Sequence, residues 1–224
     1  MLAFIVGLKS EAALLAPLRA KVFIGGGSAK GAQGAAARAV EAGASALVSF
    51  GLAGGLNPAL AAGAIIIPAR LIVHGRQIPT HEALTDALGG VTSPALLASD
   101  RVIGSAAGKA ERWADMHADA VDMESGAVAQ AAARAEIPFA IVRAICDPAT
   151  RALPPAAMSS LNRSGGISVL GLLGSLVTKP GQISDLRELA RDSAAAHKAL
   201  ADHLAKLRDR ADLRFWMKQS ALGF

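Results

Sequence analysis

Three acidic residues each come after a stretch of sequence that is typical of a buried strand. Glu11 comes after LAFIVG, Glu124 after AVDM and Asp147 after FAIVRAIC. In an open α/β sheet, ligands bind outside the carboxyl ends of the strands. The three segments would therefore bring carboxylates to one cleft, where a carboxylate can accept two hydroxyl donors in strong, charge-assisted hydrogen bonds. Each residue alone also fits an ordinary helix-start or turn position.

A glycine-rich segment, FGLAGGL (50–56), follows the strand-like ALVSF and allows the backbone to approach a ligand closely. A tight turn is the alternative interpretation. We expect Ala53 and Gly54 to line a substrate site. A second segment, GGGS (25–28), opens a helix, and helix N-termini bind anions. It is a candidate phosphate site, formed by Gly26, Gly27 and Ser28.

Other motif matches fail. GGGSAKG lacks the spacing of a dinucleotide-binding loop, because position 30 is lysine. GSAAGKA (104–110) is one residue too short for a phosphate-binding P-loop and has no Ser or Thr after its lysine. The five histidines form no H-E-x-x-H pair. We therefore expect neither a metal site nor an organic cofactor.

The elements that must position these residues alternate between strand and helix patterns. This alternation predicts a three-layer α/β domain. The N-terminal MLAFIVGLKSE lacks a basic segment and a cleavage site, which predicts a first strand rather than a signal peptide. Ser10 and Ser28 are the expected caps of the first two helices. The expected strands are 2–7, 22–24, 46–50, 64–74 with Pro68 at an edge or bulge, 95–99, 120–123 and 139–146.

The 224 residues suit a single domain, with an α/β core over 1–150 and a loop and helical extension over 151–224. In the extension, ISVLGLLGSLV (167–177) is too short to span a membrane and predicts a buried helix. Apolar residues at helical spacing predict an amphipathic helix over 182–208. Its leucine stripe, in a tail that carries +3 of the net charge of +5, fits either a lipid-facing surface or packing on the core or a second subunit.

Composition narrows the class of protein further. Aromatic residues make up 4% of the chain, and no basic stripe is interleaved with them, so nucleic-acid binding is not expected. Cys146 is the single cysteine, which forbids an intrachain disulfide and favours a reducing, cytoplasmic setting. The 52% of apolar residues is enough for a large core.

FGLAGGLNPALAAGAIII and AVDMESGAVAQAAARAEIPFAIVRAICD resemble the purine nucleoside phosphorylase and nucleosidase superfamily. Its members typically carry T-G-x-A-G-G-L, V-x-M-E-[AS]-x-A and V-R-x-[IV]-[ST]-D. The similarity runs from Met1 to about Asp147. The continuation DPATRALPPAA and the helical tail resemble the narrower hopanoid-associated phosphorylase group. The resemblance implies a three-layer α/β/α fold with a central mixed sheet and C-terminal helices, and release of adenine from a 5′-substituted adenosine.

The resemblance also implies roles for single residues. Glu124 would accept hydrogen bonds from the ribose hydroxyls, Met123 would pack on the sugar, and Asp122 would be structural. Asp147 would be the general acid that gives a proton to the purine N7, which is worth about 10²–10⁴-fold in rate. Cys146 stands where relatives have Ser or Thr, and a thiol is a poor hydrogen-bond donor.

The resemblance leaves two nucleophiles open, water and phosphate. Glu11, in E-x-x-L-L, matches the glutamate that activates water in the nucleosidase branch when one residue is skipped in the alignment. Ser49 and Leu52 replace the phosphate-binding Arg and Ser of hexameric phosphorylases, which weakens phosphorolysis. The GGGS segment and the resemblance to the hopanoid group tilt the expectation slightly to phosphorolysis, with inorganic phosphate as co-substrate. Val102 stands near the expected purine-stacking position.

The expected substrate is adenosylhopane, a lipid-linked nucleoside. The alternatives are a methylthioadenosine or adenosylhomocysteine nucleosidase and an inactive nucleoside-binding protein. A cytoplasmic homodimer with peripheral membrane contact is the expected form.

Overall fold

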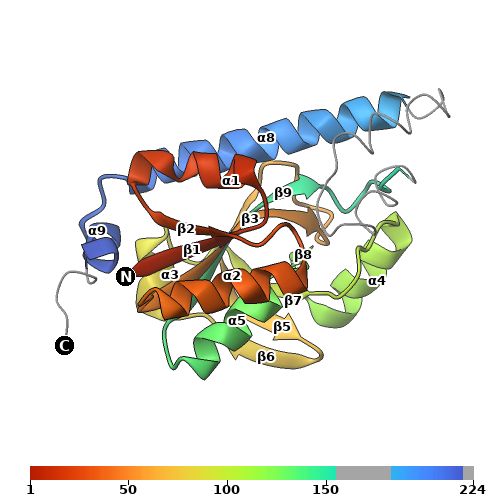
Figure 1. Cartoon of the computed structure of the whole chain (residues 1–224). Helices are drawn as coiled ribbons and strands as arrows, with labels where there is room; N and C mark the ends of the chain where they lie inside the picture. Colours follow the sequence, from red (N-terminus) through yellow and green to blue (C-terminus); the bar gives the residue numbers. More distant parts are fainter. Residues whose placement is uncertain (155–182, 219–224) are drawn as a thin grey trace.

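The computed structural model describes residues 1–154 and 183–218, which form a central twisted sheet covered on both faces by helices (Figure 1). The strands are β1 (Leu2–Val6), β2 (Lys21–Ile24), β3 (Ala46–Gly55), β4 (Ile65–Ile66), β5 (Pro68–Val73), β6 (Arg76–Pro79), β7 (Ser93–Ala98), β8 (Ala120–Asp122) and β9 (Phe139–Asp147). The helices are α1 (Lys9–Leu14), α2 (Ala29–Glu41), α3 (Glu82–Ala87), α4 (Ala106–Met116), α5 (Ser125–Arg134), α8 (Ile183–Leu207) and α9 (Ala211–Lys218), with a 3₁₀ turn at Ala16–Leu18.

The sheet is mixed, and β3 is its centre. Its strand order is β2-β1-β3-β8-β7-β5-β6, and β9 lies against both β3 and β4. Parallel pairs are β1 with β2, β1 with β3, β3 with β9, β5 with β7 and β7 with β8. The antiparallel pairs are β3 with β8, β4 with β9 and β5 with β6. The expected three-layer fold with a mixed sheet is confirmed.

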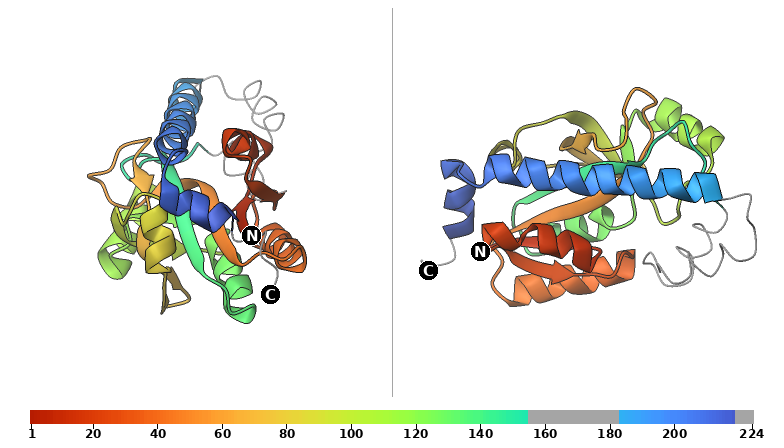
Figure 2. Two further views of the ribbon diagram at one scale, coloured as in Figure 1. Left: turned by 90° about the vertical axis from the view of Figure 1, so that its left-hand side faces the viewer. Right: turned by 90° about the horizontal axis from the view of Figure 1, so that it is seen from above.

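The two faces of β1 face different apolar cores, and a third, smaller core lies around β5, β7 and β8. Leu2, Phe4 and Val6 of β1 contribute to the core under α1, α3, α8 and α9, whereas Ala3 and Ile5 contribute to the core under α2 and α5. This alternation follows from the two-residue period of a strand, and both faces are apolar because both are covered. Figure 2 shows α8 lying along one face from a second direction.

Helix α2 packs closely because its buried face is made of alanines, at positions 32, 35, 36 and 39. The Ser28 hydroxyl accepts a hydrogen bond from the Gly31 amide at 3.2 Å, so Ser28 is the N-cap that the sequence predicts. The expected cap at Ser10 is wrong, because α1 begins at Lys9. The Glu11 carboxylate takes the Gly7 and Leu8 amides, which starts the helix earlier.

The long helix expected near the C-terminus is present as α8. Its apolar stripe packs on the core, where Ala196, Leu200, Leu204 and Leu207 are all less than 5% exposed. Of the alternatives that the sequence leaves open for this stripe, packing on the core is the one observed, because the chain's own sheet covers these leucines. No helix among the described residues is long and apolar enough to cross a membrane. The segment 167–177 lies outside the described residues.

Two strand predictions need correction. The sequence places the end of the third strand at residue 50, but β3 continues to Gly55 through the glycine-rich segment. Glycines there continue the strand because β9 pairs with it as far as Gly54, with a register shift between Ala53 and Gly54. The run 64–74 is split into β4 and β5, and Pro68 is the first residue of β5, where a missing amide is tolerated.

Candidate active site

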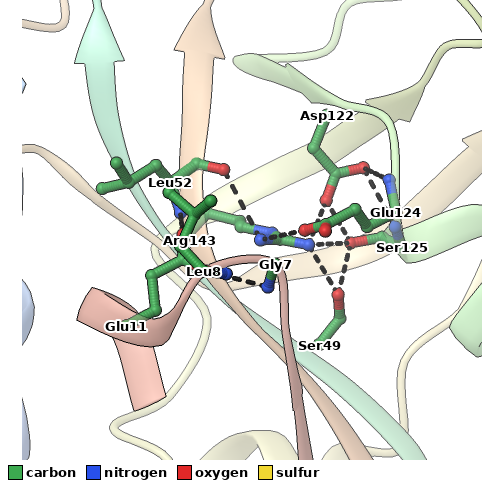
Figure 3. Close-up of polar contacts among 9 residues, drawn as sticks. All are labelled: Gly7, Leu8, Glu11, Ser49, Leu52, Asp122, Glu124, Ser125 and Arg143. Carbon is green, nitrogen blue, oxygen red and sulfur yellow. Dashed lines mark hydrogen bonds and ion pairs between the residues drawn. The ribbon is translucent and has the colours of Figure 1, made fainter. Parts of the chain in front are cut away.

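Arg143 is fully buried on β9 and organises a cluster of carboxylates from the carboxyl ends of β1 and β8, beside the middle of β3 (Figure 3). Its guanidinium lies 2.6 Å from Oδ2 of Asp122 and 3.2 Å from Oε2 of Glu124. We call Glu11, Asp122, Glu124 and Arg143 the Arg143 cluster. A buried guanidinium between two carboxylates stays charged, and these carboxylates raise the pKa of Arg143 further against the opposing effect of burial.

Two hydroxyls complete the fixed part of the cluster. Nη2 of Arg143 donates to Oγ of Ser49 at 2.7 Å and to Oγ of Ser125 at 3.3 Å. The Ser125 hydroxyl donates to Oδ2 of Asp122, whose Oδ1 accepts from the Ser125 amide at 3.2 Å. Asp122 therefore anchors the first turn of α5 and holds Arg143, in agreement with the structural role expected for it.

Glu124 differs from Asp122 because one of its oxygens is left over. Oε2 faces Arg143, but Oε1 is buried without a hydrogen-bond partner among the described residues. A Cβ on Gly7 would lie 2.6 Å from this oxygen, so any larger residue there would displace the carboxylate. Burial raises the pKa of Glu124 to about 7, opposed by Arg143 and assisted by the charges of Glu11 and Asp122. An unpaired buried acceptor is costly, which makes it a candidate to receive a ligand's hydroxyl.

Glu11 lies on the other side of the guanidinium with both oxygens engaged. Oε2 accepts from the amides of Gly7 and Leu8 at 2.8 Å each, and Oε1 accepts from the Leu52 amide at 3.0 Å. A Cβ on Gly51 would lie 2.4 Å from Oε1, and the φ of Gly51 is +151°, so this position requires glycine. Glu11 thus ties the end of β1 to β3.

Asp147, at the end of β9, has a different partner that the sequence did not indicate. Its Oδ2 lies 2.7 Å from Nζ of Lys109, which α4 supplies and which is completely buried. Burial raises the pKa of Asp147, and Lys109 opposes this increase. Oδ1 of Asp147 has no hydrogen-bond partner in the described part of the chain. A buried carboxyl of raised pKa with one free oxygen can act as a proton donor.

The glycine-rich part of β3 runs between these two groups. Gly51 and Leu52 contact Glu11 and Arg143, whereas Gly54 pairs with Asp147 on one side and Val121 on the other. At about 3.3 Å per residue, Gly51 and Gly54 are about 10 Å apart. The structure thus brings Glu11 and Glu124 together around Arg143. Asp147 lies farther along β9, the strand that also carries Arg143.

The remaining expected substrate residues are placed less directly. Ala53 is buried in β3, and Met123 is half-buried beside Glu124. Val102 lines a pocket of about 530 Å³ between α4, the loop after β7 and the turn at His74. None of the three acidic residues lines this pocket, so the structure does not bring Val102 together with them.

The candidate phosphate segment offers fewer free donors than the sequence suggests. The Gly25 amide donates to the Val6 carbonyl at 2.8 Å, and the Gly26 amide donates to the Gly7 carbonyl at 2.9 Å. The Ser28 hydroxyl already caps α2. Gly26 is therefore unavailable for an anion, which leaves Gly27 and Ser28 from the expected set.

Cys146 precedes Asp147 as a half-buried free thiol. Burial, followed by the charge of Asp147, raises the pKa of this thiol to about 12. The thiol therefore stays protonated and unreactive at neutral pH. Among the described residues, no group of three or more His, Cys, Asp or Glu side chains is placed to hold a metal ion.

Sequence reasoning missed two residues of the site, Arg143 and Lys109. Arg143 carried a signal, since it is a charged residue in the middle of the apolar strand FAIVRAIC. Buried charges are paired, so its partner had to be sought among the acids. Lys109 gave no comparable signal, because α4 is otherwise a polar helix in which a lysine is ordinary.

Comparison with known proteins shows what the chain is similar to in sequence and in fold. A model of the phosphorylase superfamily matches residues 95–163. The 5′-methylthioadenosine/S-adenosylhomocysteine nucleosidase of Neisseria meningitidis, solved with methylthio-immucillin-A, superposes with a TM-score of 0.66 at 20% identity, over 92% of this chain and 97% of that one. No curated protein matches the chain by sequence.

Two further solved structures show the same fold. The nucleosidase of the same type from Colwellia psychrerythraea, in complex with adenine, gives a TM-score of 0.62 at 19% identity, over 78% of this chain and 95% of that one. Futalosine hydrolase from Helicobacter pylori gives 0.61 at 17% identity, over 79% and 98%. The chain has the fold of the nucleoside phosphorylases and nucleosidases.

Proposed function

We propose that this protein is an enzyme that cleaves the N-glycosidic bond of an adenine nucleoside and releases adenine. The observation that carries the proposal is Oε1 of Glu124, which is buried and has no hydrogen-bond partner within residues 1–154 and 183–218. It lies in a cluster with more carboxylates than cations. Ribose hydroxyls are donors of a kind that such an oxygen accepts. The matched superfamily model and the fold support the reaction class.

Each end of the site has its own task in the proposed reaction. Glu124 accepts hydrogen bonds from the ribose hydroxyls, and Met123 packs on the sugar. As the bond to the base breaks, positive charge develops on the ribose, and the surplus of carboxylates around Arg143 stabilises it. Asp147 gives a proton to N7 of the purine, so that adenine leaves as a neutral molecule. Ala53 and Gly54 of β3 form the floor between the two ends.

We propose water as the nucleophile, in place of the phosphate that the sequence slightly favours. Ser49 is bonded to Arg143, the Leu52 amide to Glu11, and the Gly26 amide to Gly7. These contacts occupy most of the groups that could hold a phosphate. Glu11 is the motif-matched base, and Oε1 keeps one lone pair beyond its bond to Leu52 with which to orient a water molecule.

The candidate substrates differ in the group at the 5′ position of the ribose. Adenosylhopane remains the substrate suggested by the sequence resemblance. Methylthioadenosine and adenosylhomocysteine are the alternatives, supported by the similarity in fold to nucleosidases that act on them. The burial of the α8 leucines removes one argument for a lipid approach. We also propose that the protein forms a homodimer and contacts a membrane surface peripherally.

The decisive experiment measures adenine release from adenosine, methylthioadenosine, adenosylhomocysteine and adenosylhopane, each with and without phosphate. We expect release without phosphate and an unphosphorylated ribose product. Strict dependence on phosphate would reverse the choice of nucleophile, and release from none of the four would reject the enzyme. Calorimetry with adenine would then test the inactive nucleoside-binding alternative, and sedimentation with liposomes and by velocity would test membrane contact and the dimer.

A further inference from the structure

Lys109 is the only residue of α4 that is fully buried, on a helix whose other side chains are mostly exposed. Helices usually bury apolar residues on the face toward the core. A lysine in this place loses the hydration of its ammonium, and such a loss is tolerated only where the charge is paired and hydrogen-bonded. Its surroundings therefore show what it does.

The ammonium of Lys109 has a strong acceptor for each of its protons. Nζ lies 2.7 Å from Oδ2 of Asp147, 3.0 Å from the Pro148 carbonyl and 3.0 Å from the Arg151 carbonyl. A neutral amine has two N–H bonds and could not donate to all three. Three acceptors match the three N–H bonds of an ammonium, which then holds both the Asp147 side chain and the backbone that follows it.

We propose that Lys109 is a positioning residue for proton transfer: it fixes Oδ2 of Asp147, so that the transferable proton resides on Oδ1. This inference rests on the proposed function, because it assigns the atom from which the leaving adenine is protonated. Oδ2 faces N–H bonds and cannot carry a proton in the same direction. Oδ1 is the oxygen that has no partner among the described residues.

The proton balance of the step follows from this arrangement. As the bond from C1′ to N9 breaks, its electron pair moves into the purine, and the proton on Oδ1 moves to N7. Asp147 is left as a carboxylate that faces the Lys109 ammonium, which keeps its three protons throughout. Lys109 therefore makes the buried Asp147 a stronger acid by stabilising its charged form.

The other charged groups near Asp147 leave Lys109 as its principal partner. Arg151, in the loop after β9, forms ion pairs with Asp192 and Glu188 of α8, so its charge is already matched. The neighbouring Cys146 thiol is neutral, because burial raises its pKa to about 12. Burial raises the pKa of Asp147, and Lys109 acts against that increase more than any other group.

The test replaces Lys109 in three ways and measures two quantities. Lys109→Met and Lys109→Gln remove the charge, and the glutamine amide can still donate to the loop carbonyls. Lys109→Arg keeps the charge, and Lys30→Met repeats the substitution on an exposed helical lysine as a control. The first quantity is the titration of the Asp147 carboxyl by carbon-13 NMR, assigned with Asp147→Asn.

We expect the Asp147 titration midpoint to rise by about one pH unit or more in Lys109→Met and Lys109→Gln, since an opposite charge at this distance is worth about 1–3 units. Lys109→Arg should retain most of the wild-type value, and Lys30→Met all of it. If Lys109→Met fails to fold, the glutamine variant carries the measurement. An unchanged midpoint in both neutral variants overturns the proposal.

The second quantity is the cleavage rate with two leaving groups. Adenosine needs protonation of its base, whereas 4-nitrophenyl riboside has a leaving group that departs as an anion without an acid. We expect both neutral variants to lose about 10²-fold on adenosine and to change little on the nitrophenyl substrate. Equal losses on the two substrates mean a structural role and overturn the inference. Wild-type inactivity on every substrate rejects the proposed function instead, while the NMR titration still reports on the Lys109 contact.

Discussion

The two ends of the site hold their carboxylates in opposite ways. At the Arg143 cluster, one guanidinium forms ion pairs with Asp122 and Glu124 and lies near a third carboxylate, Glu11. Among the described residues, only Oε1 of Glu124 and Nε of Arg143 in this cluster are buried without a hydrogen-bond partner. At the other end, one carboxylate faces one ammonium, and the other two protons of that ammonium bind backbone carbonyls. The first end has a surplus of negative charge, and the second is balanced.

This difference fits the charges that the proposed reaction creates. A surplus of negative charge suits a sugar that becomes positive, and a balanced pair suits an acid that must become charged after giving up its proton. The two groups of residues also link different elements of the fold. The Arg143 cluster links β1, β3, β8 and β9 to one another, whereas Lys109 links α4 to the loop after β9. Substitutions at the two ends should therefore fail in different ways.

The largest effect is expected where one cation serves three acids. Arg143→Met leaves Asp122 and Glu124 buried without their counter-charge, and breaking a buried pair in this way typically costs about 3–5 kcal/mol. We expect a loss of that size in the free energy of unfolding, measured by urea denaturation, together with loss of activity. Arg134→Met, at the exposed end of α5, should change stability by less than about 1 kcal/mol. A stable Arg143→Met variant would show that the cluster does not hold the sheet together.

Substitution of Asp147, in the balanced pair with Lys109, should reduce catalysis but not the stability of the fold. Asp147→Asn keeps the shape of the side chain but has no acidic proton, so we expect adenine release to fall by about 10²–10⁴-fold with a nearly unchanged melting temperature. Steady-state kinetics and calorimetric melting check the two halves of this statement. Asp115→Asn, on the exposed side of α4, is the matched control. Wild-type turnover in Asp147→Asn would remove Asp147 from the mechanism.

The surplus charge at the Arg143 cluster predicts a dependence of stability on pH. Since burial raises the pKa of Glu124 from 4.5 to about 7, the folded chain keeps a proton between these values that the unfolded chain has lost. The free energy of unfolding contributed by Glu124 therefore falls as the pH rises through this range. The Glu124→Gln variant has no carboxyl to titrate and lacks this loss. Its free energy of unfolding minus that of the wild type should therefore be larger at about pH 8 than at about pH 5, by roughly 2–3 kcal/mol.

Urea denaturation of both proteins at the two pH values measures this difference, and other titrating groups cancel because both proteins contain them. Activity should change in the opposite sense, since the glutamine weakens ribose binding and turnover together. A stability difference that is independent of pH would mean that Glu124 stays ionised in the folded chain.

The smallest effect tests how tightly the Arg143 cluster is packed. A Cβ on Gly7 would lie 2.6 Å from Oε1 of Glu124, so Gly7→Ala must push this carboxylate aside, at a cost of about 1–3 kcal/mol. The matched control is Gly34→Ala in α2, where the new Cβ would meet nothing closer than 3.5 Å. This control should stabilise the helix by about 0.5–1 kcal/mol. Thermal melting should therefore shift in opposite directions for the two alanines.

The acidic residues of the candidate site could be chosen from the sequence because their signal is local. Apolar runs identify the strands, and in an open α/β sheet residues just after strand ends gather at one edge, which was sufficient for Glu11, Glu124 and Asp147. The helix over 182–208 was predicted for a similar reason, since its period is visible in the chain. The strands and helices of the core also follow from alternation and from the Ser28 cap.

The partners of these residues could not be predicted, because they come from elements far apart in the sequence. Nothing near Lys109 reveals that the loop after β9 places two carbonyls and a carboxylate around it. The extension of β3 through its glycines depends on pairing with β9, and the loss of Gly26 as a donor depends on pairing with the end of β1. Local sequence patterns indicate which residues lie near the candidate site. Tertiary pairing decides which of their hydrogen-bonding groups remain available to a ligand.

The long sequence separation within the Arg143 cluster has a consequence for synthesis of the chain. Ser49 and Glu11 leave the ribosome well before Arg143, which follows Ser49 by 94 positions. Until then, the acid and hydroxyl that face its guanidinium have no buried cation to meet, and the centre of the sheet cannot close around β3. We therefore expect the sheet to close around β3 only after β9 emerges, because contacts of such long range form slowly. Until then, the apolar strands β1 and β3 would lack their partners, and exposed strands of this kind favour aggregation of a nascent chain.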